Sequence, residues 1–279
     1  MENEFYRFQL GDFKCVSLYD GSMNYKLESM VVNQPKEPVE AYLREHNLPV
    51  EHITTPYAYL FVDTGQNRLL VDMGAGQLAP TTGMLLHSMC AAGINPDEID
   101  TVFITHAHPD HIGGTLDDQG RLVYANARYF IWKDEWDFWF SNEALAKTGE
   151  FFTNCARDNL SPLQGRVTLV EDENELLPGV RAIAAPGHTP GHVVVAFTSQ
   201  GKQMFYAGDT VLYPFHLEHP DWLPVFDILP EKAAISKHRI FDLAAEARVL
   251  VLGQHFPPFP NLGTIKKQNN GWFWQPIMM

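Results

Sequence analysis

Three histidines and an aspartate crowd into one short stretch of the chain, Thr105-His106-Ala107-His108-Pro109-Asp110-His111. The residues just before it, 99–105, form a continuous apolar run that predicts a strand buried on both faces. Imidazole nitrogens and carboxylate oxygens are the ligands that zinc and related divalent ions prefer. The stretch therefore predicts a metal site at the end of a strand, and a histidine-rich surface loop is the alternative.

The same ligand types recur at three later points of the sequence. His188 stands in Pro-Gly-His-Thr, Asp209 in Ala-Gly-Asp-Thr and His255 in Leu-Gly-Gln-His, each after a segment with a strand pattern. Loops at the ends of strands on a rigid scaffold are where catalytic groups usually lie. Because separate strand ends each supply a ligand type, we favour the metal site over the surface loop.

The elements that must position these residues can be read from hydrophobic patterns and turn residues. Strands are predicted over residues 13–22, 57–64, 67–76, 99–105, 166–171, 180–186, 192–199, 202–209 and 248–255. Helices are predicted over residues 38–47, 84–93, 129–160 and 232–247. This order predicts an α/β protein of two sheets packed face to face with helices outside, as a single domain over residues 1–279. Residues 28–55 are predicted to form an N-terminal arm or lid.

The combined motifs resemble those of the metallo-β-lactamase superfamily. They are HxHxDH at 106–111, PGHTPGH at 186–192, GDT at 208–210 and the late GxH ending at His255. The resemblance covers nearly the whole chain. It implies a four-layer αβ/βα sandwich of two mixed β-sheets flanked by helices, with metals in a cleft at one edge of the sheets.

The resemblance also implies two metal ions that share one carboxylate. The first ion is assigned to His106, His108 and His188, the second to Asp110, His111 and His255, and Asp209 bridges them. Zinc is the expected metal, with iron or manganese as alternatives. Two such cations lower the pKa of a shared water to about 7, which supplies hydroxide at neutral pH. Asp110 and Asp209 are thus the predicted catalytic residues, and His192 is predicted to orient or pack rather than to bind metal.

Beyond the metals, the chain looks most like the quorum-quenching lactonase and methyl parathion hydrolase-like branch. The likeness rests on the N-terminal arm, on the aromatic stretch around Trp132, Trp136 and Trp139, and on residues 208–222. It implies hydrolysis of a lactone or another apolar ester, in the manner of an N-acyl homoserine lactonase, with a phosphotriester side activity. Lactonases of that branch carry tyrosine three residues after the bridging aspartate, where this chain has Leu212.

Four residues near Asp209 are the predicted contacts for substrate: Tyr213, Phe215, His216 and Trp222. The alternative for each aromatic side chain, including Phe151, Phe152 and Phe226, is the hydrophobic core or a dimer interface. Three other functions stay open. They are a mononuclear iron enzyme similar to persulfide dioxygenases, a glyoxalase II-like thioesterase, and a non-catalytic protein that binds metal or ligand.

Composition limits the partners and the location. The 279 residues include 34 acidic and 20 basic ones, a formal charge of −14 that disfavours nucleic acid and anionic membranes. The sequence shows neither a long apolar run nor a leader pattern, and three scattered cysteines do not indicate a disulfide framework. We therefore expect a cytoplasmic enzyme that acts on a small molecule. The sequence leaves the oligomeric state open, with a homodimer as one option.

Overall fold

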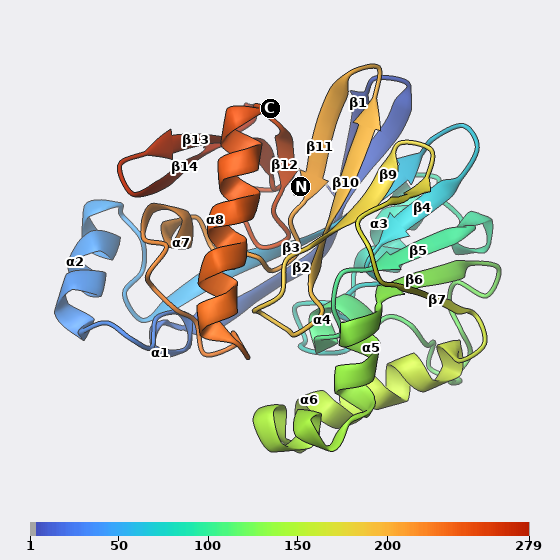
Figure 1. Ribbon diagram of the computed structural model, residues 1–279, viewed down its shortest axis with the longest axis horizontal. Helices are drawn as coiled ribbons and strands as arrows, with labels where there is room; N and C mark the ends of the chain where they lie inside the picture. Colours follow the sequence, from blue (N-terminus) through green and yellow to red (C-terminus); the bar gives the residue numbers. More distant parts are fainter. Residues whose placement is uncertain (1–3, 279) are drawn as a thin grey trace.

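Two seven-stranded mixed sheets pack face to face in the computed structural model, which describes residues 4–278, and helices cover their outer faces (Figure 1). The prediction of an α/β sandwich with helices outside is confirmed.

The first sheet keeps its strands in sequence order. They are β1 (Phe5–Leu10), β2 (Phe13–Lys26), β3 (His52–Asp63), β4 (Arg68–Val71), β5 (Thr101–Ile104), β6 (Arg128–Trp132) and β7 (Val167–Val170). Strands β1 to β4 pair antiparallel, and β4 to β7 pair parallel. The parallel strands end on the same side of the sheet, so β5 delivers the loop that starts at Thr105 to an edge between the sheets.

The second sheet has the order β14-β13-β12-β11-β10-β9-β8. Its strands are β8 (Glu175–Leu177), β9 (Val180–Ala184), β10 (Val193–Ser199), β11 (Lys202–Tyr206), β12 (Leu250–Leu252), β13 (Leu262–Gln268) and β14 (Gly271–Pro276). All neighbours pair antiparallel except β11 and β12, which run parallel. Because β11 and β12 are parallel neighbours, the loops that carry Asp209 and His255 leave the sheet side by side.

The helices are α1 (Leu27–Met30), α2 (Lys36–Glu45), α3 (Leu85–Ala91), α4 (Pro109–Ile112), α5 (Lys133–Phe140), α6 (Asn142–Leu160), α7 (Phe215–Glu218) and α8 (Pro230–Glu246). Two short 3-10 turns, η1 (Pro96–Glu98) and η2 (Ser161–Leu163), complete the set. None of the helices within residues 4–278 is both long and apolar enough to cross a membrane.

Three apolar clusters hold the layers together. The central one lies between the sheets and includes Val62 and Phe103 from the first sheet and Val195 and Phe197 from the second. A second cluster packs the first sheet against α3, α5 and α6, and a third packs the other sheet against α8. A strand that is buried on both faces has a continuous apolar sequence. The apolar run over residues 99–105 therefore predicts a strand.

The prediction of a helix over residues 129–160 is wrong at its beginning. Residues 129–132 belong to β6, which pairs in parallel with both β5 and β7. Tyr-Phe-Ile-Trp is as apolar as a buried helix turn, so periodicity alone does not separate the two. The helical part is itself divided at Ser141 and again at Gly149, whose φ of 76° and ψ of 178° interrupt α6.

The predicted arm is ordered as α1, α2 and their connecting loops, and β3 begins at His52. We call residues 27–50 the arm. Its apolar side chains, among them Met30 and Leu43, share a cluster with Leu212 and Trp222 from the segment after Asp209. The arm therefore packs against the chain that follows β11.

Candidate metal centre

The histidine-rich loop starts where β5 ends and turns at once into the single-turn helix α4. Pro109 occupies the first turn of this helix, where its missing N–H costs nothing. The turn presents Asp110 and His111 on the same side as His106, and Met73 donates its backbone N–H to the His111 carbonyl at 2.7 Å. The loop is thus fixed to the end of β4 as well as to β5.

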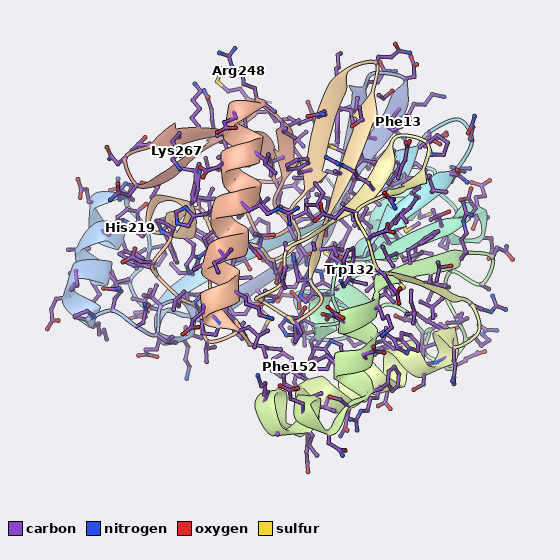
Figure 2. All side chains as sticks on the ribbon, viewed as in Figure 1. Phe13, Trp132, Phe152, His219, Arg248 and Lys267 are labelled. Atoms are coloured by element: carbon purple, nitrogen blue, oxygen red, sulfur yellow. The ribbon has the colours of Figure 1, made fainter. Side chains whose placement is uncertain are left out.

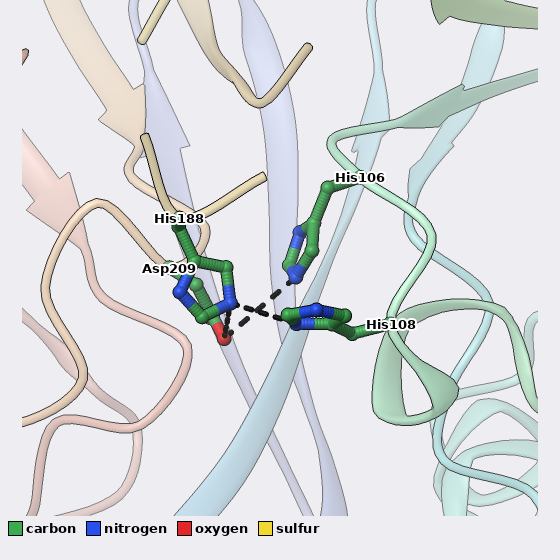
Figure 3. Close-up of side chains that lie close together, drawn as sticks. All are labelled: His106, His108, His188 and Asp209. Carbon is green, nitrogen blue, oxygen red and sulfur yellow. Dashed lines mark hydrogen bonds and ion pairs between the residues drawn. The ribbon is translucent and has the colours of Figure 1, made fainter. Parts of the chain in front are cut away.

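His106, His108, His188 and Asp209 form the first group of ligand types (Figure 3). One potential ligand atom from each residue lies within 4.8 Å of all the others. Asp209 Oδ2 is 3.3 Å from His188 Nε2 and 3.8 Å from His106 Nε2. His188 Nε2 also lies 2.8 Å from His108 Nδ1. Three imidazoles and a carboxylate around one point are four ligands of the types that zinc prefers.

Asp110, His111, His255 and again Asp209 form the second group, within the same 4.8 Å limit. His255 Nε2 lies 3.4 Å from Asp110 Oδ2 and 3.2 Å from Asp209 Oδ1. His111 Nε2 is 3.3 Å from that same Asp209 oxygen. The two oxygens of Asp209 therefore face different groups, as a bridging carboxylate requires.

Unpartnered atoms test whether a metal fits these residues. Among the described residues, His106 Nε2, His111 Nε2 and Asp209 Oδ1 are fully buried and have no hydrogen-bond partner. Buried polar atoms without a partner are rare because their desolvation is not compensated. All three point into the two groups, so the donor set fits divalent cations.

Charge and burial set the protonation of the cluster. Burial lowers the pKa of His106 and of His108 well below the usual range, which leaves both imidazoles neutral and able to bind metal. Burial alone would raise the pKa of Asp209, but His255 and His111 hold it well below the usual range. Asp209 is therefore a carboxylate at neutral pH.

Hydrogen bonds behind the ligands fix their orientation. Asp72 Oδ2 lies 2.7 Å from His111 Nδ1, and the same carboxylate accepts the backbone N–H and the hydroxyl of Thr105. Asp227 Oδ1 lies 3.0 Å from His188 Nδ1. A carboxylate on the outer nitrogen of a histidine leaves the inner nitrogen free for a metal.

His192 contacts the cluster without joining either group. Its Nε2 accepts the backbone N–H of Asp209 at 2.9 Å. Gly208, with a φ of 49°, lies so close that a Cβ there would stand 2.7 Å from this nitrogen. The structure thus places His192 as a support for the turn that carries Asp209.

Glu135 is a supporting residue that the sequence did not reveal. Its buried carboxylate accepts the backbone N–H groups of Ala107 and Gly191, the Thr189 hydroxyl and the indole N–H of Trp139. It thereby joins the loop that carries His106 and His108 to the turn that carries His188. A single glutamate inside a predicted helix gives no signal of this kind, because the residues that it joins are distant in sequence.

A cavity of about 210 Å³ leads to the cluster. His108, Asp110, His188, Asp209 and His255 line one side of it. The other lining residues are mostly apolar: Met23, Tyr25, Met30, Thr55, Leu78, Pro109, Phe151, Phe152, Leu212 and Phe226. Phe152 projects from α6 (Figure 2), and its ring centre lies 5.2 Å from that of His108. The site is therefore an ionic cluster that faces an apolar space.

The four predicted substrate contacts do not line this cavity. Tyr213, Phe215, His216 and Trp222 are buried behind its wall, and the three aromatic ones pack with the arm. His216 Nε2 lies 2.8 Å from the backbone carbonyl oxygen of Met30, a cavity residue. They shape the wall from behind, while Leu212 and Phe226 from the same part of the chain reach the cavity.

Comparisons with known proteins agree with this geometry. A family model described as the metallo-beta-lactamase superfamily matches residues 54–255. The N-acyl homoserine lactonase AiiA of Bacillus thuringiensis subsp. kurstaki is 23% identical over 223 residues, which are 75% of this chain and 82% of that one.

Two solved structures superpose over nearly the whole chain. The dizinc quorum-quenching lactonase AidC, in complex with the product N-hexanoyl-L-homoserine, has a TM-score of 0.91 at 30% identity. The match covers 99% of this chain and 98% of that one. The hydrolase AbOPH of the beta-lactamase superfamily has a TM-score of 0.92 at 24% identity, over 100% and 99% of the two chains.

Proposed function

This chain belongs to the metallo-β-lactamase superfamily as a metal-dependent hydrolase, and on that premise we propose that it opens lactones that carry an apolar acyl chain. We further propose that it does so at a centre of two zinc ions within a single domain.

The shared position of Asp209 carries the proposal of two metals. Its Oδ2 faces the His106, His108 and His188 group, and its Oδ1 faces the Asp110, His111 and His255 group. The match to a dizinc lactonase over 99% of this chain supports the same number of ions.

Divalent ions held by these residues would lower the pKa of a bound water and withdraw electrons from the substrate carbonyl. Asp110 lines the cavity, where its carboxylate would serve as the acceptor for a proton of the attacking water. His188 and His108 close the same side of the cavity. The chain needs no serine or cysteine nucleophile for this chemistry, since the water is the attacking group.

The cavity favours a substrate with an apolar portion. Two carboxylates, Asp110 and Asp209, line one side, and methionine, leucine and phenylalanine side chains dominate the other. An apolar acyl chain would release water from that surface, which favours substrates that carry such a chain. Phosphotriesters with apolar substituents meet the same condition and are the proposed side activity.

Metal analysis of the purified protein beside a substrate panel tests this proposal. The panel contains N-acyl homoserine lactones of several chain lengths, an alkyl γ-lactone, a paraoxon-type triester, an aryl ester and a thioester. We expect two zinc ions per chain and the fastest turnover on a lactone with a medium or long acyl chain. One iron per chain with oxygen consumption and no hydrolysis would instead favour the dioxygenase-like alternative.

A further inference from the structure

Two hydroxyl groups stand out in the apolar wall of the cavity. Outside the ligand set, Tyr25 and Thr55 are the described lining residues that carry a hydroxyl. They come from the paired strands β2 and β3, where Thr55 lies opposite Met23 and Tyr25 lies two residues further along β2. Side chains two apart on a strand share a face. The two hydroxyls therefore belong to one patch of the wall.

The hydroxyl of Thr55 has no partner. Thr55 is 1% exposed, and its Oγ1 is a buried atom without a hydrogen bond among the described residues. Threonine on a strand usually satisfies its hydroxyl with a neighbour, because an unmade buried hydrogen bond costs free energy. An unpaired hydroxyl that borders a ligand-sized cavity is in position to bind a polar atom of whatever enters.

The hydroxyl of Tyr25 has a hydrogen-bond partner that can act either as acceptor or as donor. It is hydrogen-bonded to the Tyr57 hydroxyl, which also donates to Met23 Sδ at 3.4 Å. While Tyr57 donates to the sulfur, Tyr25 must donate to Tyr57. If Tyr57 donates to Tyr25 instead, the Tyr25 proton becomes available to the cavity, and only a weak sulfur acceptor loses its partner.

The tyrosine pair lies beside the ionic cluster. The ring centres of Tyr57 and His255 lie 4.8 Å apart. Burial and then the charge of Asp110 raise the pKa of Tyr25 well above its usual range, so its hydroxyl keeps its proton at neutral pH. Leu212 supplies no hydroxyl to the cavity, which leaves Tyr25 as the neutral donor next to the metal ligands.

We propose that Tyr25 and Thr55 form the polar subsite for the substrate. Tyr25 donates a hydrogen bond to the oxygen of the carbonyl under attack, and Thr55 donates to a second carbonyl oxygen, that of an amide on the acyl chain. This inference rests on the proposed lactonase function and names the groups that give it specificity. It selects lactones that bear an acylamino group over plain alkyl lactones.

Three variants on two substrates test the subsite. Tyr25→Phe, Thr55→Val and the control Tyr57→Phe are assayed on N-hexanoyl-homoserine lactone and on an alkyl γ-lactone, with metal content measured for each. Tyr57 does not line the cavity, so its variant removes the partner of Tyr25 without removing a donor to substrate.

We expect Tyr25→Phe to lower kcat about 10²-fold on both lactones with two metals retained, as for loss of one donor to a developing oxyanion. Thr55→Val should raise KM about five-fold for the acylamino lactone only. Tyr57→Phe should change kcat by less than Tyr25→Phe does. Equal losses in the two tyrosine variants, or a kcat of Tyr25→Phe within two-fold of wild type, would overturn the role of Tyr25.

Binding of the product separates this inference from the proposed function. Calorimetry of N-hexanoyl-L-homoserine with the metal-loaded protein reports on the subsite even if the wild-type chain opens no lactone. A Kd that weakens several-fold in Thr55→Val and not in Tyr57→Phe supports the subsite independently of turnover. A Kd unchanged in Thr55→Val, or no binding to the wild-type protein, contradicts it.

Discussion

The two ligand groups share Asp209 but differ in charge and in the way they are supported. The first group adds three imidazoles, two of which burial keeps neutral, and its outer anchor is Asp227. The second adds a further carboxylate, Asp110, and its His111 is anchored by the fully buried Asp72. More negative charge binds a cation more strongly, whereas neutral ligands leave the cation a stronger Lewis acid. We therefore expect the second group to retain its metal ion more tightly. We expect the ion of the first group to activate a bound water more strongly.

Removing the shared residue should give the largest effect. Asp209→Ala takes a ligand from both groups and leaves their histidines buried without their counter-charge. We expect loss of most bound metal and a fall in kcat/KM of at least about 10³-fold. Elemental analysis and lactone hydrolysis measure both. A variant that retains two metals would contradict the bridging role.

Removing one ligand from each group should separate the groups. His108→Ala and Asp110→Ala are matched, because each lines the cavity and contributes to one group only. We expect each variant to keep about one metal per chain, held more tightly in His108→Ala, where the more negative group is intact. Competition with a chelator ranks the two. The reverse order would contradict the charge argument.

A smaller effect is expected from the residue behind His111. Asp72→Asn keeps the side-chain volume but removes the charge that orients the imidazole. We expect metal affinity of the second group to fall about 10- to 100-fold, with the first group unaffected. Zinc titration of the metal-free variant should then show one unchanged and one weakened binding step.

Acidity should produce a graded loss of metal from both groups, because neighbouring carboxylates outweigh burial and raise the pKa of His111 and of His255 as well as that of His188. Burial lowers the pKa of His188, but its hydrogen bonds to Asp209 and Asp227 outweigh burial and raise it to about 9 in the metal-free protein. Below that pH a metal must displace the His188 proton, so its affinity falls about ten-fold per pH unit for that one proton. Zinc titrations between pH 6 and 9 measure the slope. Asp227→Asn removes one cause of the raised pKa and should flatten the slope.

The sequence predicted the metal cluster better than the groups that surround it. The residues from His106 to His111 are close in sequence, and His188, Asp209 and His255 each follow a strand, so topology alone brings them together. Asp72 and Glu135 act through single contacts with distant segments, and a lone acidic residue carries no pattern for that role. His192 is predicted to be a supporting residue because seven other residues already complete the ligand set.

The cavity wall was harder to predict because aromatic content does not show which way a side chain points. Tyr213, Phe215 and Trp222 have the residue types of a substrate pocket and stand close to Asp209 in the sequence, yet their contacts with the arm keep them in the core. Phe151 and Phe152 reach the cavity where Gly149 interrupts α6, a break that helical periodicity does not reveal. Strands β1, β8, β13 and β14 are also not among the predicted elements, although polar and apolar residues alternate in β1, a pattern that itself indicates a strand.

The hydrogen bond between His216 and the backbone carbonyl of Met30 has a consequence for how such enzymes diversify. The arm meets the cavity at Met30, while most ligands sit on loops fixed by Asp72, Glu135 and the ends of the strands. Substitutions in the arm can therefore accumulate with little effect on the hydrolytic apparatus. Mutations in the arm alone can in this way change the substrate preference of one scaffold several times. The metal-dependent hydrolysis is retained throughout.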